Sequence, residues 1–185
     1  MRILILSIAK SGSSYLTYLL KHNLGREYSL LFEPKTVNEI DDALKENVNV
    51  VCKVLVNQLK WNELITSGVK EKFDKIIYLV RHPLDILVSS TFYQWNKYGV
   101  HTLPDYIEFL KQLYLYKSNS NKREFLQIMD YSLIKEFKSY LKMIKSCKHS
   151  NVIVLKYEAL LANRIEPLLK LIQFGYLRKT TVPIH

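Results

Sequence analysis

Short continuous apolar runs alternate along the chain with longer segments in which apolar residues recur every three or four positions. Five of the runs are too short for helices, and the first is rich in β-branched residues, which is typical of strands buried on both faces of a parallel sheet. They cover Ile3–Leu6, Tyr28–Phe32, Val48–Val56, Lys75–Val80 and Asn151–Leu155. The segments between them predict helices after Ser14, over residues 36–47, 57–72, 103–116 and 123–147, and from Pro83 and Tyr157 onward. This alternation predicts an α/β fold in three layers, α/β/α, with a mostly parallel sheet of about five strands.

Length and composition indicate a single globular domain over residues 1–185, large enough to bury a core. The formal net charge of +10 favours an anionic ligand or partner, but it does not separate a nucleotide from an acidic glycan, a nucleic acid or a membrane surface. With only Cys52 and Cys147 there is no disulfide framework, so a reducing compartment and a cytoplasmic location are expected. No apolar run approaches the length of about 18 residues that a transmembrane helix needs.

A loop of small polar residues follows the first predicted strand and precedes the first predicted helix. In the sequence Ala9-Lys10-Ser11-Gly12-Ser13-Ser14, the glycine permits close backbone approach, the serines add hydroxyl donors and the lysine adds a positive charge. The first N–H groups of the following helix would point into this loop, which predicts a site for phosphate or sulfate. It is not a Walker A loop, because that motif has its lysine directly after the last glycine. The alternative is an ordinary strand-to-helix turn that needs small residues for packing.

A second candidate anion site lies at the end of the fourth predicted strand. Arg81 leaves the strand, Pro83 begins a helix, Asp85 lies in its first turn and Ser89 follows eight residues after the arginine. Taken singly, Arg81 is an ordinary surface cation and Ser89 an ordinary helix residue. However, ligands of parallel α/β sheets bind beyond the carboxyl ends of the strands. We therefore expect the residues that directly follow four of the strands to meet at one edge: Lys10, Glu33, Arg81 and Tyr157.

These motifs resemble those of the sulfotransferases that use 3′-phosphoadenosine 5′-phosphosulfate (PAPS). The run from Lys10 to Tyr15 is similar to their 5′-phosphosulfate loop, and Arg81-x-Pro83-x-Asp85 with Ser89 is similar to their 3′-phosphate motif. The segment from Val154 to Leu160, followed by Phe174-Gly175, resembles a third family motif. The form SGSSY followed by Phe32-Glu33-Pro34 looks most like the carbohydrate branch. The resemblance covers about Arg2 to Gly175 and implies a P-loop-like version of the α/β/α fold.

The resemblance implies sulfuryl transfer from PAPS to a hydroxyl or amine of a small-molecule or glycan acceptor, including a carbohydrate, with no metal ion. Lys10 would meet the charge that develops on the leaving oxygen. Tyr15 would stack on the adenine and Tyr157 would help to hold the purine. Residues with an implied role in binding PAPS are Lys10, Ser11, Gly12, Ser13, Ser14, Tyr15, Arg81, Ser89 and Tyr157.

The acceptor also needs a general base, and Glu33 is the predicted one. Cytosolic relatives carry a histidine two residues after a lysine that resembles Lys53, but Leu55 stands at that position here. The best candidate is then Glu33, a carboxylate at a strand end that faces the cleft, positioned like the glutamate of the carbohydrate branch that Phe32-Glu33-Pro34 resembles. The alternative is a structural hydrogen-bond acceptor at a turn. The weaker candidates for the base are His22, His82 and His101.

One departure from the family pattern and two rival functions remain. Relatives continue past the Phe-Gly segment into a glycine-rich basic loop, whereas this sequence ends ten residues after Gly175, so a C-terminally short sulfotransferase domain is expected. A nucleotide or small-molecule kinase would need a lysine after the loop glycine. A nucleic-acid or nucleotide-binding module without turnover would use the lysines between Lys135 and Lys148, but these lie opposite an apolar stripe, as on an ordinary solvated helix face. No nucleic-acid partner is therefore expected.

Overall fold

The structure is a computed structural model, and it describes residues 1–56, 61–98, 107, 111, 132–147 and 151–162. The chain forms two compact units, which are described separately. The first comprises Met1–Arg81 with Ser139–His185, and the second comprises His82–Lys138. A single domain over residues 1–185 stays a prediction.

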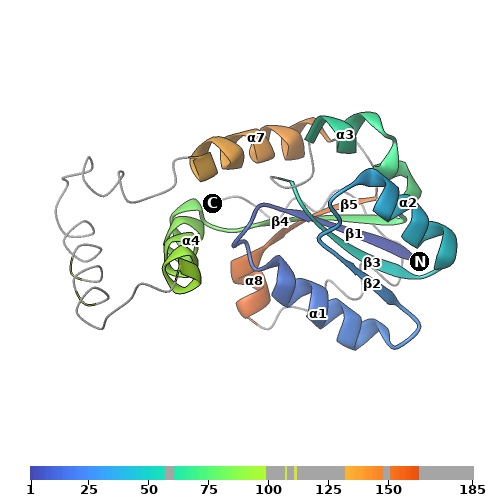
Figure 1. Cartoon of the computed structure of the whole chain (residues 1–185), viewed down its shortest axis with the longest axis horizontal. Coiled ribbons are helices and arrows are strands. Elements are labelled where there is room, and N and C mark those ends of the chain that lie inside the picture. Colours follow the sequence, from blue (N-terminus) through green and yellow to red (C-terminus); the bar gives the residue numbers. More distant parts are fainter. Residues whose placement is uncertain (57–60, 99–106, 108–110, 112–131, 148–150, 163–185) are drawn as a thin grey trace. The chain divides into compact units, whose positions relative to one another are not determined.

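The first unit is built around a five-stranded sheet in which every neighbouring pair is parallel, in the order β2-β3-β1-β4-β5 (Figure 1). This arrangement confirms the predicted parallel α/β sheet, and each strand lies within a few residues of its predicted position. The carboxyl ends of all five strands lie at one edge, where the predicted site residues follow. The strands are β1 (Arg2–Ser7), β2 (Ser29–Phe32), β3 (Val50–Leu55), β4 (Lys75–Val80) and β5 (Val152–Lys156).

Helices cover both faces of this sheet, as the prediction of three layers requires. α1 and α8 lie on one side, and α3 lies on the other together with the part of α7 that belongs to the first unit (Figure 1). In the second unit, α4 begins at Pro83, the predicted first helical residue. None of the described helices is long and apolar enough to cross a membrane. The helices are α1 (Ser13–Leu24), α2 (Val37–Glu46), α3 (Trp61–Thr66), the 3₁₀ helix η1 (Val69–Lys72), α4 (Pro83–Tyr98), α7 (Ser132–Ser146) and α8 (Tyr157–Leu161).

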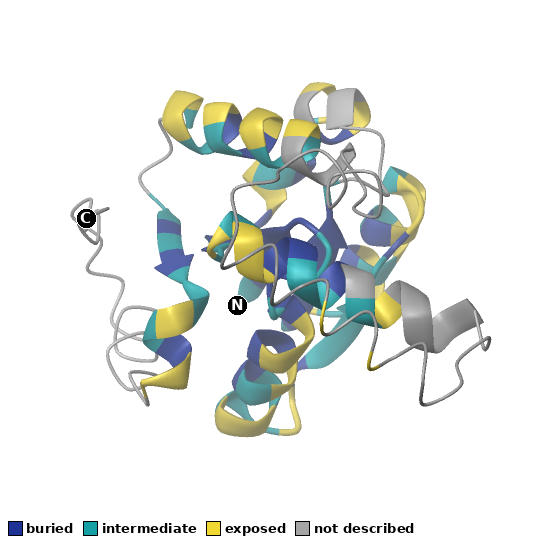
Figure 2. Cartoon of the chain, turned by 90° about the vertical axis from the view of Figure 1, so that its left-hand side faces the viewer, coloured by how far each residue is buried: buried dark blue, intermediate teal, exposed yellow. Residues whose placement is uncertain are grey.

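The core of the first unit is formed by the strands themselves. Ile3–Leu6 are completely buried, and the same holds for the central residues of β3 and β4 (Figure 2). Tyr140 of α7 contacts two strands near their carboxyl ends. Its hydroxyl lies 2.7 Å from the Leu6 carbonyl oxygen of β1 and 3.0 Å from the Leu79 carbonyl oxygen of β4. Burial raises the pKa of this hydroxyl well above its ordinary value, so it remains a neutral donor. The two strands that carry Lys10 and Arg81 at their ends are thus tied together.

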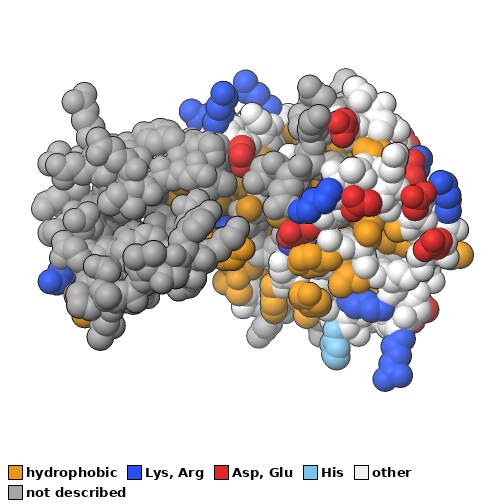
Figure 3. Space-filling model, in the orientation of Figure 1, with side chains coloured by type: hydrophobic (Ala, Val, Ile, Leu, Met, Phe, Trp, Pro, Cys, Tyr) orange, Lys and Arg blue, Asp and Glu red, His pale blue; other side chains and the backbone are white. Residues whose placement is uncertain are grey.

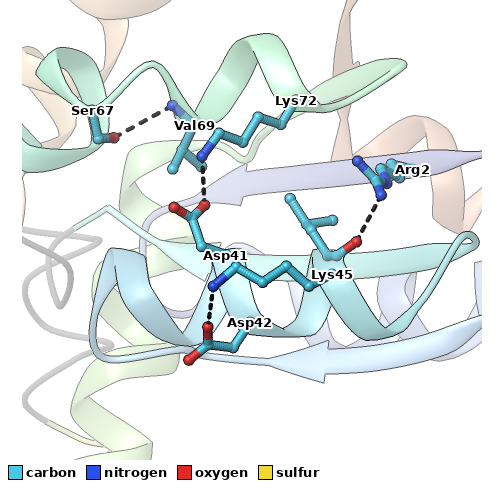
Figure 4. Close-up of polar contacts among 8 residues, drawn as sticks. Arg2, Asp41, Asp42, Lys45, Ser67, Val69 and Lys72 are labelled. Atoms are coloured by element: carbon cyan, nitrogen blue, oxygen red, sulfur yellow. Dashed lines mark hydrogen bonds and ion pairs between the residues drawn. The ribbon is translucent and has the colours of Figure 1, made fainter.

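Side-chain contacts fix both ends of α2. Its first turn has the predicted capping arrangement, in which Thr36 accepts a hydrogen bond from the Glu39 N–H and the Glu39 carboxylate accepts one from the Lys35 N–H. At the other end, Arg2 at the start of β1 donates to the Leu44 carbonyl at 2.7 Å (Figure 4).

The helix predicted over residues 57–72 is interrupted. Gly68 adopts a left-handed conformation with φ 65°, which ends the α-helical path after α3 and lets the chain enter η1. Lys72 of η1 pairs with Asp41 of α2 at 2.8 Å (Figure 4). Residues 57–60, the helix predicted over 103–116 except residues 107 and 111, and the part of the helix predicted over 123–147 that precedes Ser132 lie outside the described residues.

Candidate active site at the carboxyl edge of the sheet

The loop between β1 and α1 presents the start of a helix with no cap. Lys10 and Gly12 both have left-handed backbone conformations, with φ values of 64° and 84°, and α1 begins at Ser13. No side chain caps the helix and no acidic residue lies in its first turn; its first backbone bond runs from the Leu16 N–H to the Gly12 carbonyl. The N–H groups of the preceding turn therefore have no partner inside the helix, and the positive end of the helix dipole points into the loop. This geometry suits an anion, as predicted.

Gly12 has a steric requirement that the sequence did not reveal. A Cβ atom at this position would lie 2.1 Å from a ring carbon of Tyr157, the first residue of α8. Only glycine combines the positive φ with this close approach. Tyr157 thus contacts the loop, the hydrophobic core and, as shown next, Arg81, and its contact with a purine stays a prediction.

Arg81 connects the two predicted anion sites. Its Nη1 donates to the carbonyl oxygen of Lys10 at 3.0 Å, and its guanidinium carbon lies 4.6 Å from the centroid of the Tyr157 ring. The buried Nε has no hydrogen-bond partner among the described residues. Arg81 therefore holds the β1–α1 loop with one nitrogen and keeps a second donor for a ligand.

Buried hydroxyl groups without a partner also mark the loop. Ser11 is completely buried, and its Oγ has no hydrogen-bond partner among the described residues; the same is true of Ser7 at the end of β1. Buried polar atoms are nearly always paired, so each unpaired one needs an explanation. A ligand with several anionic oxygens would accept a hydrogen bond from Ser11, and the loop thus fits a phosphate or sulfate group.

Lys10 supplies the positive charge of the loop. Its pKa is lowered from the ordinary value, chiefly because burial disfavours the charged ammonium; the Glu33 carboxylate opposes this shift and the Lys53 ammonium adds to it. Lys10, Glu33 and Lys53 therefore lie close enough to interact electrostatically. An arriving anion would favour the charged form of Lys10.

Glu33 lies at the edge of the sheet as predicted, but it is not alone there. Its backbone is left-handed, with φ 54°, and its Oε1 lies 2.5 Å from the Nζ of Lys53 on β3. The same Nζ lies 2.9 Å from the Oγ of Ser14 and 4.0 Å from the centroid of the Phe32 ring. Lys53 is only 2% exposed and was not among the predicted site residues. A lysine inside the apolar run from Val48 to Val56 was the signal, because a buried ammonium needs a partner.

The remaining predicted residues are placed as follows. Tyr15 lies on the first turn of α1 and is exposed, which base stacking requires. Ser13 is buried. Ser89 lies on α4 of the second unit, so its part in a 3′-phosphate site stays a prediction. Of the histidines considered as bases, His101 lies outside the described residues. No group of three or more histidine, cysteine or acidic residues in the described part of the chain could hold a metal ion.

Comparisons with known proteins agree with this geometry. A family model described as a sulfotransferase domain matches residues 1–180. Comparison with curated protein sequences gives no match. Among solved structures, the chain is similar to mouse sulfotransferase SULT7A1 in complex with PAP, with a TM-score of 0.58 and 19% identity over 97% of this chain and 60% of that one. It is also similar to a sulfotransferase from Alicyclobacillus acidocaldarius, with a TM-score of 0.50 and 14% identity over 100% of this chain and 86% of that one. At these identities the structural likeness supports the fold, and the chain spans 60% of the length of SULT7A1.

Proposed function

The chain belongs to the sulfotransferase family, and we propose that it transfers a sulfuryl group from PAPS to a hydroxyl or amine of a small-molecule or glycan acceptor. The observation that carries this proposal is the contact of Arg81, the arginine of the second candidate anion site, with the loop of the first. The uncapped start of α1, the unpaired Ser11 hydroxyl and Lys10 would form one site, and the guanidinium that holds the Lys10 carbonyl would belong to the other. A donor with a phosphosulfate at one end and a 3′-phosphate at the other requires two such sites.

In the proposed reaction, PAPS supplies the activated sulfuryl group, and the residues of the chain orient it and manage charge and protons. The loop N–H groups and Ser11 bind the anionic oxygens. The Lys10 ammonium stabilises the negative charge that grows on the oxygen that leaves. Glu33 accepts the proton of the acceptor through Oε2, the carboxylate oxygen that does not face Lys53, as the bond between the acceptor and sulfur forms.

The finer part of the proposal is a carbohydrate hydroxyl as acceptor. It is supported by the resemblance of Phe32-Glu33-Pro34 to the carbohydrate branch of the family. A nucleic-acid partner has less support, because acidic side chains lie among the basic ones on the face drawn in Figure 3. A transfer assay with labelled PAPS against glycan, phenol and amine acceptors would test this part.

The donor site can be tested without knowledge of the acceptor. We expect adenosine 3′,5′-bisphosphate (PAP) to raise the melting temperature clearly more than AMP, which lacks the 3′-phosphate. At 100 times its dissociation constant, a ligand stabilises the native state by about 2.7 kcal/mol. For a chain of this size that corresponds to a rise of roughly 5–11 °C. Equal shifts with PAP and AMP would contradict the proposed function.

A further inference from the structure

Lys53 contacts Glu33 through both its backbone and its side chain. In the pairing of β2 with β3, Phe32 lies opposite Lys53, and the Glu33 N–H donates to the Lys53 carbonyl at 2.9 Å. The Lys53 ammonium then reaches the Glu33 carboxylate at 2.5 Å. The backbone and the side chain of the candidate base are thus both held by one residue of the neighbouring strand.

The same ammonium connects Glu33 to the donor-binding loop. Its nitrogen lies 2.9 Å from the Ser14 hydroxyl in the first turn of α1 and sits over the Phe32 ring. Ser14 is 39 residues away in sequence from Lys53, and Glu33 is 20 residues away. Lys53 is therefore the described side chain that spans the gap between the proposed base and the loop.

Burial makes this contact costly to lose. Lys53 is 2% exposed, and an ammonium in such a place is stable only while it is paired. Glu33 is less buried, with a side chain that is 25% exposed, so the carboxylate is partly accessible although Lys53 holds Oε1. Left-handed backbone at a non-glycine residue, as at Glu33, also persists only when its surroundings fix it.

We propose that Lys53 is the positioning residue of Glu33: its ammonium fixes the carboxylate beside the β1–α1 loop. This inference rests on the proposed role of Glu33 as general base. Among the described residues, Lys53 on β3 and Lys10 in the β1–α1 loop are charged groups that interact with Glu33. On α2, the Glu39 carboxylate is engaged in the helix cap, where it accepts hydrogen bonds from the Lys35 N–H and the Thr36 hydroxyl.

The test compares Lys53→Met and Lys53→Gln with the wild type in three measurements. We expect both variants to keep the affinity for PAP within about threefold, because the loop N–H groups, Ser11 and Lys10 are intact. Transfer should fall by about 10²-fold, within the range of a lost general base. The loss should appear in kcat and leave the KM for PAPS nearly unchanged, because the loop is intact while the carboxylate is no longer held in place.

Two further variants separate positioning from general damage. Glu33→Gln should lose transfer to a similar extent as Lys53→Met and keep the affinity for PAP. Lys72→Met, which breaks the ion pair between η1 and Asp41 of α2, should change neither transfer nor the affinity for PAP. If Lys53→Met transfers at a near-normal rate, Lys53 does not position the base. Near-normal transfer by Glu33→Gln would overturn the inference as well.

Thermal denaturation tests the pair without any activity. Glu33→Gln and Lys53→Met should each lower the melting temperature, whereas the double variant should be no less stable than the worse single variant, because it leaves no unpaired buried charge. Additive losses would show that the two side chains do not interact. If the wild type neither binds PAP nor transfers sulfate, the proposed function fails, while this cycle still reports on the pair. If the wild type transfers normally but the losses of melting temperature in the two single variants add up in the double variant, the inference about Lys53 fails while the proposed function stands.

Discussion

Substitution of Gly12 by alanine probes the most constrained point of the proposed donor site. Two costs are expected. A residue with a Cβ atom loses about 1–2 kcal/mol in the left-handed conformation that Gly12 adopts at φ 84°. In addition, the new Cβ would lie 2.1 Å from the Tyr157 ring, so the ring or the loop must move, and overpacking of this kind costs about 1–3 kcal/mol. The free energy of unfolding should therefore fall by about 2–5 kcal/mol, which lowers the melting temperature by roughly 4–20 °C.

Gly68→Ala is the matched control. Gly68 has a similar φ of 65°, but its nearest neighbour would be 3.7 Å from the added Cβ atom, so only the conformational cost applies. We expect a fall in melting temperature of roughly 2–8 °C for this variant, with unchanged affinity for PAP. Gly12→Ala should also weaken PAP binding, because the loop shifts.

The contact with Tyr157 can be isolated by a double-mutant cycle. In a Tyr157→Ala background the obstructing ring is absent, so Gly12→Ala should be less destabilising there than in the wild type. Differential scanning calorimetry of the four proteins measures the coupling directly. Equal losses for Gly12→Ala and Gly68→Ala, together with additive effects in the cycle, would refute the steric reasoning.

Three further predictions concern the charged residues of the site. Arg81→Ala should remove the difference in thermal shift between PAP and AMP. It should also weaken AMP binding a few-fold, because the Lys10 carbonyl loses its hydrogen-bond donor. The control is Arg2→Ala, which loses a similar guanidinium–carbonyl bond at the other end of β1 and should leave both affinities unchanged. Lys10→Ala should reduce turnover far more than PAP binding, and parallel losses in both would make Lys10 a simple phosphate anchor. Because the pKa of Lys10 is lowered, the alkaline limb of the pH profile of kcat/KM for PAPS should begin at lower pH than an ordinary lysine would give. Lys10→Arg stays charged and should move this limb to higher pH. If the limb does not move, it belongs to another group.

Local sequence signals predicted the framework of the site well. The apolar run before Lys10 and the small residues after it were enough to predict a strand, a tight loop and a helix start, since each depends on neighbours within a few positions. The Thr36 cap was equally local. The predicted helix over residues 57–72 was wrong in its continuity, because an isolated glycine is compatible with a helix and only the path of the chain shows that Gly68 ends one.

The contacts that make the site chemically specific are not local. Tyr157 and Gly12 lie far apart in sequence and meet because α8 follows β5, two strands away from β1 in the sheet. Nothing in either segment encodes that approach. The sequence could therefore suggest that Tyr157 belongs to the site, but not that its ring packs against the loop and beneath Arg81.

The pairing of Glu33 with Lys53 depends on strand register above all. In the parallel pairing of β2 with β3, Phe32 lies opposite Lys53, and this register brings Glu33, the residue that follows β2, within reach of the Lys53 ammonium. Because successive side chains of a strand point to opposite faces, a slip of one residue would turn Lys53 away from the partners it now meets. It would then leave a buried ammonium without its carboxylate, at a cost that the fold could not absorb easily. The same register that buries the apolar residues of β3 thus also fixes the distance between the proposed base and the loop that is proposed to bind the donor.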